Sequence, residues 1–498
     1  MAEHLISTAE ASADLLACAA FIAEDIKNHD VHASAMMTIV PRYLERGDVD
    51  LAAELANTVD DPFTRDKLLS AVAEKCASLD DDEYAMQLAE AIEDIGQRSQ
   101  TIEKIAIQKG AKGETEKALA FADRIAHPEY IYADLALRLA AASDDAGSNA
   151  MLDRIEYPAA SVSALQAIAQ LEINSGEMEK AAGSLEAAAE EAAAIEHDEE
   201  RIRALCEIGS LYTLAEKPAE AVKCFEIAAE QSEALTTHRD FFIANASLGM
   251  MQAGDADAAD GALEMLRDKT QAASCLVGFS KEYRKRGELN DAMEELEEAY
   301  AIFRSQKDSE VRDSKAKFAV HRLIAVEFAE NGSLERAVEI ARETADPAEK
   351  NAALTQIAQV IQLAGDDEKA REIIAAIPED PDRLYALLGM SDQKFQSGEK
   401  DAAVKLLEDA RILAETIPNL GPRSAALAEI AGRLFRCGHA DKAQAAAHED
   451  LEYISSMTNA GTQAAALANL SPMYTSGGLE VGAFESEILE SIVRRSQI

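Results

Sequence analysis

A phrase of the form Gly-x-x-x-x-Ala recurs along almost the whole of this 498-residue chain. It occurs at Gly47/Ala52, Gly113/Ala118, Gly176/Ala181, Gly254/Ala259, Gly287/Ala292, Gly332/Ala337, Gly365/Ala370, Gly398/Ala403, Gly438/Ala443 and Gly478/Ala483. Weaker copies fill the gaps at Asp80/Ala85, at Gly147/Leu152 and at the turn Lys217-Pro218, which leads to Val222. Many successive anchors are 33 or 34 residues apart and others up to 45. A register kept over so many turns predicts a chain built from repeats of one supersecondary unit.

The residues before each anchor predict a helix that packs closely on a neighbour. A large apolar residue stands eight positions before the anchor, as at Val72 and Ile105, and a small one follows it, as at Ala73 and Ala106. A further apolar residue stands eleven before, so these positions share one helical face. Gly ends the helix because it takes left-handed backbone angles without a steric cost. Acidic residues then suit the first turn of the next helix, so each unit is predicted to be a helical hairpin.

This combination of features resembles the tetratricopeptide repeat (TPR). The family's aromatic residue four before the turn is matched at Tyr43, Tyr283 and Phe328. Its Trp at the start of the first helix is absent, because the chain contains no Trp. The resemblance covers roughly residues 33–490. It implies an all-α, right-handed superhelical solenoid of about thirteen TPR-like hairpins.

The same reading predicts the organisation of the chain. We expect an N-terminal capping helix over residues 1–29, one continuous array over 30–478 and a C-terminal capping helix over 479–498. Terminal units of a solenoid need a polar outer face because no neighbour covers them. Four long spacings, 176 to 217, 287 to 332, 398 to 438 and 438 to 478, predict lengthened second helices with charged outer faces.

The charge of the chain restricts its partners. There are 92 acidic and 48 basic residues, which give a formal net charge of −44. Nucleic acids and anionic membranes are disfavoured, because binding to them depends on Lys and Arg. The acidity has two explanations. It suits a salt-rich cytoplasm, where salt screens the repulsion between carboxylates, or it attracts a basic protein partner.

We expect a cytoplasmic protein. The N-terminal region lacks the basic opening of a secretory signal and carries acidic residues throughout. No stretch of 18 apolar residues predicts a membrane span. The six cysteines form no Cys-x-x-Cys pair and lie in apolar stretches, where a reduced cysteine behaves as a small hydrophobe.

Signals for catalysis or metal binding are weak. The segment His29-Asp30-Val31-His32 has ligand types but no partner ligands nearby, so solvated histidines explain it better. Cys206 and Cys224 face each other across one predicted hairpin, and apolar packing explains both. The chain contains no Gly-rich phosphate loop, nucleophile elbow or His-Glu-x-x-His segment. We therefore predict neither a catalytic residue nor a cofactor or metal.

A cation recurs fifteen residues before many anchors. It occurs at Arg65, Arg98, Arg239, Lys317, Lys350, Arg383 and Arg423. One interpretation is a ladder of cations that grips a ligand along the groove. The favoured interpretation is an ion pair between helices, or a hydrogen bond to the last carbonyls of the previous unit, because the cation recurs at the same position of the repeat.

One basic run departs from the acidic background. Lys281, Arg284 and Lys285 lie in KEYRKRG, and the resemblance places them on the concave groove together with Arg322 and Gln359 of the next units. Together they would grip a carboxylate-bearing tail. The alternative is that these cations neutralise nearby acids, at Glu294, Glu295, Glu297 and Glu298.

Three functions follow from this reading. The first is a non-catalytic scaffold or adaptor that holds a partner peptide or helix in the concave face. The partner would be an acidic or C-terminal peptide at the basic patch, or a basic protein on the acidic surface. The alternative is a small-molecule-sensing or regulatory protein with a pocket inside the solenoid. A helical-repeat RNA binder ranks last, because it would need a basic concave face.

Overall fold

The computed structural model describes residues 4–306, 313–475 and 478–497. Over these residues every regular element is a helix, so the predicted all-α class is confirmed. Consecutive helices pack in pairs, each formed by a first helix, a short turn and a second helix. The handedness and the number of the hairpins stay predictions. None of the described helices combines the length and the apolar character needed to cross a bilayer.

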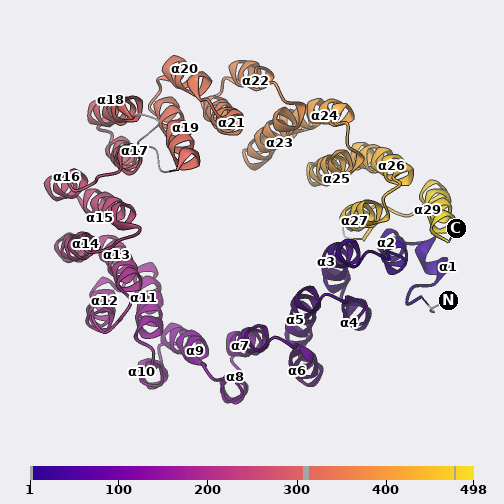
Figure 1. The fold of residues 1–498 in the computed structure, drawn as a ribbon, viewed down its shortest axis with the longest axis horizontal. Helices are drawn as coiled ribbons and strands as arrows, with labels where there is room; N and C mark the ends of the chain where they lie inside the picture. Colours follow the sequence, from indigo (N-terminus) through magenta and orange to yellow (C-terminus); the bar gives the residue numbers. More distant parts are fainter. Residues whose placement is uncertain (1–3, 307–312, 476–477, 498) are drawn as a thin grey trace. The chain divides into compact units, whose positions relative to one another are not determined.

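The chain divides into two compact units. The central unit is His127–Ile373, and the terminal unit joins Met1–Ala126 to Ile374–Ile498. In the central unit the first helices lie on the inner side of an arc and the second helices on its outer side (Figure 1). Its helices are α9 (Glu129–Ala141), α10 (Asp145–Leu152), α11 (Pro158–Asn174), α12 (Met178–Ala192), α13 (Asp198–Leu214), α14 (Pro218–Ser232), α15 (Arg239–Ala253), α16 (Ala256–Glu264), α17 (Lys269–Arg286), α18 (Leu289–Ser305), α19 (Ser314–Glu330), α20 (Leu334–Glu343) and α21 (Pro347–Leu363), followed by α22 (Asp367–Ala375) at its boundary.

The terminal unit contains helices from both ends of the chain. From the N-terminal end come α1 (Thr8–Ala11), α2 (Leu15–Glu24), α3 (His29–Arg46), α4 (Val49–Asn57), α5 (Pro62–Ser78), α6 (Asp82–Ala91), α7 (Ile95–Ala111) and α8 (Thr115–Ala122). From the C-terminal end come α23 (Asp380–Gln396), α24 (Lys400–Thr416), α25 (Leu420–Arg436), α26 (Ala440–Ser456), α27 (Ala460–Leu470), α28 (Pro472–Thr475) and α29 (Ala483–Ser496). The division into two caps and one array, with boundaries at 29 and 478, stays a prediction.

The predicted turns are left-handed. All ten anchor glycines have positive φ, from 72° at Gly478 to 95° at Gly254. Asp80, the predicted substitute for a glycine, also has a positive φ of 67°. Because Gly takes this conformation at no steric cost, its repeated placement explains why the first helices end where they do.

Two of the weaker anchors were placed wrongly. The left-handed residue is Ser143 (φ 61°) rather than Gly147, which lies inside α10. It is Glu216 (φ 58°) rather than Lys217, which is the N-cap of α14. Gly and Pro are the residues by which such turns are recognised in a sequence, whereas these two turns use Ser and Glu, which carry no such signal.

The corrected register restores the repeat pattern in α9. Eight and seven residues before Ser143 stand Leu135 and Ala136, whose exposed fractions are 1% and 0%. The residues expected there, Leu139 and Ala140, are only half-buried. The rule of a large apolar residue followed by a small one therefore holds, four positions earlier than predicted.

Small residues mark where the two helices of a pair come closest. Ala292 at the start of α18 and Ser280 in α17 are both fully buried, and Ala337 and Ala325 take the same places in the next pair. Side chains this small let the helix backbones approach closely. This confirms the predicted contact points.

The second helices form a short and a long class. α8 and α10 have 8 residues each, whereas α12 has 15 and α18, α24 and α26 have 17 each. Four of the five long second helices among the described residues are those that the long anchor spacings predicted, and the fifth, α14 with 15 residues, was not predicted.

Three of the seven recurring cations join successive repeats in the way that the structural interpretation predicted. Arg98, Arg383 and Arg423 donate hydrogen bonds of 2.7–3.0 Å to the backbone carbonyl six residues earlier, beyond the end of the previous second helix. Arg201, which the sequence analysis did not select, does the same to Ile195. Each guanidinium thus satisfies a carbonyl that the helix end leaves without a partner.

Ion pairs also join consecutive second helices. Lys180 of α12 lies 2.8 Å from Asp145 of α10, and Lys117 of α8 lies 2.8 Å from Asp82 of α6. The partners are one repeat apart in sequence, so the bridges follow from the period. Exposed pairs of this kind contribute about 0.2–1 kcal/mol each.

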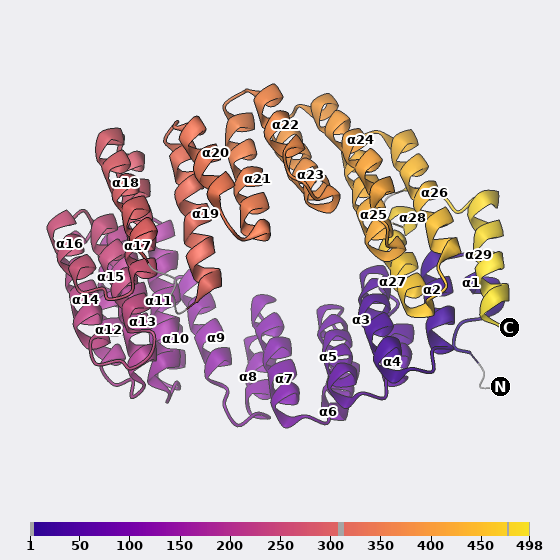
Figure 2. The ribbon, with the colours of Figure 1, turned by 45° about the horizontal axis from the view of Figure 1, so that its top comes forward.

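The two ends of the chain meet inside the terminal unit. α27 packs against α2 and α3, and α29 packs against α26 and α2. α3 and α27 lie side by side in both views of the ribbon (Figure 1 and Figure 2). α2 is buried along nearly its whole length: Leu15, Leu16, Cys18, Ala19 and Ala20 have an exposed fraction of 0%.

Candidate functional site

The inner side of the central unit carries the predicted site. Its first helices α13, α15, α17, α19 and α21 follow one another along this side (Figure 1). Polar side chains connect α15 to α17, α17 to α19 and α19 to α21. Gln252 on α15 donates to Glu282 on α17 over 3.4 Å, and the pairs described below join α17 to α19 and α19 to α21.

Arg284 is engaged by a buried carboxylate of the next first helix. Its Nε lies 2.8 Å from Glu327 Oε1 and its second terminal nitrogen 3.4 Å from Glu327 Oε2. Glu327 has an exposed fraction of 1%, and Asn331 also donates to it over 3.1 Å. The hydrogen bond to Glu327 raises the pKa of the Arg284 guanidinium above its usual range. Removing this guanidinium would leave a buried carboxylate without its counter-charge, which is strongly destabilising.

Arg322 makes the equivalent link one repeat later. Its Nε lies 2.7 Å from Glu349 Oε2, and a terminal nitrogen donates to Gln356 Oε1 over 3.0 Å. Both partners lie on α21. The cations therefore pair with acids inside the chain, but with Glu327 and Glu349 rather than with the four glutamates of α18 considered from the sequence.

The other predicted residues face outward to different degrees. Lys285 is exposed and pairs at 2.7 Å with Glu282 on its own helix. Lys281 and Gln359 are half-buried, and over the described ranges neither makes a hydrogen bond or ion pair. The five residues thus lie on three consecutive first helices, and two of them link those helices together.

Sequence reasoning missed a cavity on the same side, between α13 and α15. Its volume is about 350 Å³. Its apolar lining includes Phe225, Phe242, Leu248 and Gly249, and its polar lining Arg203, Glu207, Ser210, Asn245 and Gln252. Phe241 also lines it and remains 46% exposed.

The Phe241-Phe242 pair was the available signal for this cavity. Neighbouring residues on a helix point in different directions, so a helix with one face on the core buries one of two adjacent aromatics and leaves the other near the surface. Phe242 is 2% exposed, and its ring lies edge-on to that of Phe241 with centroids 5.3 Å apart. Phe241 is therefore left at the surface beside the cavity.

The cavity wall contains a protonated thiol. Burial, with smaller contributions from Glu207 and Cys224, raises the pKa of Cys206 to about 12. Burial also raises the pKa of the Glu207 carboxyl, and the nearby Arg203 opposes this shift. A thiol with this pKa is a poor nucleophile at neutral pH, so Cys206 contributes packing and not reactivity.

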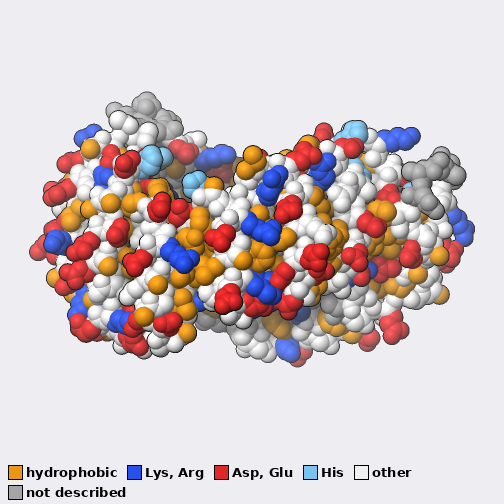
Figure 3. Space-filling model, turned by 90° about the horizontal axis from the view of Figure 1, so that it is seen from below, with side chains coloured by type: hydrophobic (Ala, Val, Ile, Leu, Met, Phe, Trp, Pro, Cys, Tyr) orange, Lys and Arg blue, Asp and Glu red, His pale blue; other side chains and the backbone are white. Residues whose placement is uncertain are grey.

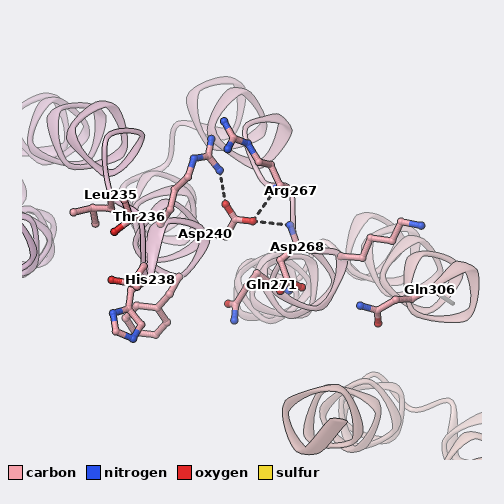
Figure 4. Close-up of a pocket in the computed structure, with 12 residues that line it drawn as sticks. Leu235, Thr236, His238, Asp240, Arg267, Asp268, Gln271 and Gln306 are labelled. Carbon is pink, nitrogen blue, oxygen red and sulfur yellow. Dashed lines mark hydrogen bonds and ion pairs between the residues drawn. The ribbon is translucent and has the colours of Figure 1, made fainter. Parts of the chain in front are cut away.

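A larger cavity of about 780 Å³ lies at the ends of α14, α16 and α18 (Figure 4). Asp240 is at its centre, where it accepts hydrogen bonds from the backbone N–H groups of Arg267 and Asp268, 2.9 and 2.6 Å long, and pairs with Arg239. Gln306 at the far wall bonds to Thr270 over 3.0 Å. Asp240 and Gln306 are therefore satisfied by groups of the chain itself, whereas the buried Nε of Arg239 makes no hydrogen bond within the described part of the chain.

The histidine-rich segment forms no metal site. His29 pairs with Asp60 at 2.6 Å, and His32 lies 3.5 Å from the Thr58 hydroxyl. In the part of the chain that the structure describes, no group of three or more His, Cys, Asp or Glu side chains is arranged to hold a metal ion.

No family model and no curated protein matches the sequence. Among solved structures, the TPR-like repeats of a putative kinesin light chain from Podospora anserina show 18% identity over 53% of this chain and 100% of that chain, with a TM-score of 0.22. The apo quorum sensor NprR from B. thuringiensis shows 12% identity over 65% and 97%, with a TM-score of 0.25. Yeast Tom70 shows 12% identity over 90% and 97%, with a TM-score of 0.29. Scores this low carry no argument about function, so the description of the chain as a helical-repeat protein similar to TPR proteins rests on its own helix pairs and turns.

Proposed function

We propose that this chain is a non-catalytic scaffold that holds a peptide or helix of a partner protein against the first helices of its central unit. The observation that carries the proposal is the exposed ring of Phe241 beside a cavity with an apolar floor and a polar rim. Aromatic anchors surrounded by polar groups are typical of the residues that contribute most to protein–protein binding. The cavity volume suits one large apolar side chain of the partner.

The predicted basic patch extends this site toward α17, α19 and α21. Lys281 and Lys285 supply positive charge at the surface, and Gln359 offers an amide for a peptide backbone. Arg284 and Arg322 position the binding surface and do not contact the partner, because their ion pairs with Glu327 and Glu349 hold the three helices in register. The favoured partner is therefore a segment with a large apolar residue next to acidic ones. The acidic outer surface is the alternative contact for a basic protein.

A peptide library displayed on phage and selected on the purified chain tests this proposal. We expect selected peptides to pair an apolar anchor with acidic residues. Phe241→Ala should weaken their binding at least tenfold, which corresponds to about 1.4 kcal/mol. Leu289→Ala on α18 is the matched control, because Leu289 is 53% exposed and lies on a second helix.

The outcomes separate the possibilities. Lys281→Glu should weaken the same peptides without altering the melting temperature, since Lys281 has no partner within the described ranges. Equal binding by Phe241→Ala, Lys281→Glu and the wild type would reject this face as the site. Peptides that are rich in Lys and Arg and insensitive to Phe241→Ala would favour the acidic surface.

A small-molecule sensor is the second candidate function, and the 780 Å³ cavity favours it. The volume suits a ligand of metabolite size. Thermal shift with a metabolite collection should then stabilise the wild type but not Arg267→Ala, since Arg267 lines the cavity. Because Asp240 is already satisfied by its neighbours, we rank this function below the scaffold.

We place the scaffold in the cytoplasm. All six cysteines are free thiols, and five of them are buried. Free thiols persist in reducing compartments. Labelling with an organelle-specific tag in the native cell checks this assignment.

A further inference from the structure

The joint between the two ends of the chain is formed by helices that no turn connects. In other pairs, such as α17 with α18 and α25 with α26, a first helix packs against the second helix that follows it through a short turn. α27 instead packs against α2, which belongs to the opposite end of the chain, and α3 continues the row of first helices after α27. No turn connects the two sides of this joint, which lie more than four hundred residues apart in sequence.

The contact across the joint is apolar and close. A Cβ atom built on Gly461 at the start of α27 would overlap Cγ1 of Val31 on α3. Behind this contact, Phe21, Ile22 and Leu16 of α2 and Leu467 of α27 have exposed fractions of 0–2%. Complementarity at the joint therefore depends on shape and on one glycine.

Polar side chains do not reinforce the joint. Asp14 pairs with Arg46 and Glu24 accepts from the backbone of Leu5, all at the N-terminal end. Asn459 bonds to Thr462 and Gln463 to the carbonyl of Ile454, all at the C-terminal end. Within the described part of the chain, the hydrogen bonds and ion pairs of the side chains on α2, α3 and α27 all stay at their own end. Among the described residues of these helices, no side-chain hydrogen bond or ion pair has to break for the two sides to separate.

We propose that this joint is an exchangeable interface, whose second occupant is the same N-terminal segment, α1 to α3, of another copy of this chain. The two surfaces are complementary because they pair within one molecule. When they separate, each exposes apolar side chains that the joint buries, among them Leu16 and Phe21 on one side and Leu467 on the other. A second copy supplies a cover of the right shape, and the result is a head-to-tail assembly by exchange of identical elements.

A disulfide across the joint allows a direct test. Cβ of a residue at position 461 would lie 3.8 Å from Cβ of residue 31, and this is the usual Cβ separation in disulfides, about 3.8 Å. The full-length variant Val31→Cys/Gly461→Cys should therefore close an internal bond on oxidation. Val31→Cys/Gly183→Cys is the control pair, because Gly183 lies on α12 of the other unit with open space around it.

Two measurements then decide the proposal. Wild type held at high concentration just below its melting temperature, then diluted, should contain species of twice the chain mass by light scattering. The oxidised Val31→Cys/Gly461→Cys variant should contain none, and its reduced form should behave as wild type. Separately, full-length Val31→Cys mixed with full-length Gly461→Cys should yield a covalent dimer on oxidation, at least tenfold above the dimer in either variant alone.

Two results would overturn the proposal. Dimers in equal amount from wild type and from the oxidised variant would show that copies associate through another surface. The absence of both the dimer and the mixed disulfide would show that the joint does not exchange, given that the double variant forms its internal bond.

Discussion

At the scale of single residues, Phe225 shows how the glycines inside helices of this chain are used. Its ring, on α14, is 1% exposed and lies against Gly209 of α13 and Gly249 of α15. A Cβ on Gly209 would lie 2.8 Å from the ring, and one on Gly249 would overlap it. One aromatic side chain therefore sets the approach of two successive first helices beside the proposed binding cavity.

Gly249→Ala should destabilise the chain because it forces the Phe225 ring out of its place. We expect a loss of about 1–3 kcal/mol, typical of overpacked cores, measured by urea unfolding. Gly183→Ala is the matched control, since it also adds a methyl group inside a helix but into open space. It should stabilise by about 0.5–1 kcal/mol. A Gly249→Ala variant as stable as the wild type would contradict the close packing.

Glu295 gives a residue-scale prediction about pH. Burial, followed by repulsion from Asp260 and then from Glu298, Glu294 and Asp291, raises its pKa to about 7. Between the ordinary glutamate pKa and 7, the folded chain holds a proton that the unfolded chain releases. The stabilisation is therefore complete at low pH and is lost as pH rises through 7.

Glu295→Gln should remove this dependence. At pH 8 the variant should be more stable than wild type by about 1–2 kcal/mol, a figure that allows for solvent screening of a half-exposed side chain. At pH 5 the two should melt at nearly the same temperature. Differential scanning calorimetry at both pH values checks this, and an equal difference at both would contradict it.

At the scale of elements, the turn between first and second helices determines the register. Ten of these turns place Gly in a left-handed conformation, whereas Asp80, Ser143 and Glu216 adopt it with a side chain. A non-Gly residue in this conformation is strained by about 1–2 kcal/mol. The register at these turns is therefore held by the packing of the neighbouring helices and not by the turn itself.

Ser143→Gly should relieve this strain and stabilise the chain by about 0.5–1 kcal/mol, measured by the urea midpoint. Gly176→Ala, at the next turn with φ 79° and nothing within 4 Å, should destabilise it by a similar amount. A destabilising effect of Ser143→Gly would argue that Ser143 is not the left-handed residue.

Sequence alone predicted most of these elements. The Gly-to-Ala spacing located the ends of most first helices and the buried contact at Ala292. The long spacings located the long second helices except α14. It did not find Ser143, because a left-handed serine has no sequence signature. It did not find the cavity beside Phe241, because that depends on which of two adjacent aromatics turns outward. The contact of Val31 with Gly461 was out of reach, since Ala-rich helices at opposite ends of a chain carry no pattern that pairs them.

At the scale of the whole molecule, the net charge of −44 is the dominant feature. Acidic side chains are scattered over the face drawn in Figure 3 and interleaved with fewer basic ones. Ion pairs such as Lys180 with Asp145 and Lys117 with Asp82 use some of the cations between repeats. Uncompensated carboxylates therefore repel one another in the folded state.

Salt should stabilise the folded chain by screening this repulsion. Raising NaCl from 0.1 to 1 M shortens the Debye length from about 10 to about 3 Å. We expect the melting temperature, measured by circular dichroism at constant pH, to rise steadily over this range. A melting temperature that falls with NaCl would mean that ion pairs between repeats outweigh the net repulsion.

The proposed binding of a partner protein at Phe241, on the inner side of the central unit, can be tested in the cell. In the most direct experiment, Phe241 is replaced by a photo-crosslinking phenylalanine analogue, and the chain is expressed in its native cell. Phe63, which is 74% exposed on α5 of the other unit, takes the same analogue as control. We expect light to produce one dominant protein adduct from position 241, and we expect this adduct to be absent from position 63. The same adduct from both positions, or no adduct from position 241, would reject Phe241 as the binding site.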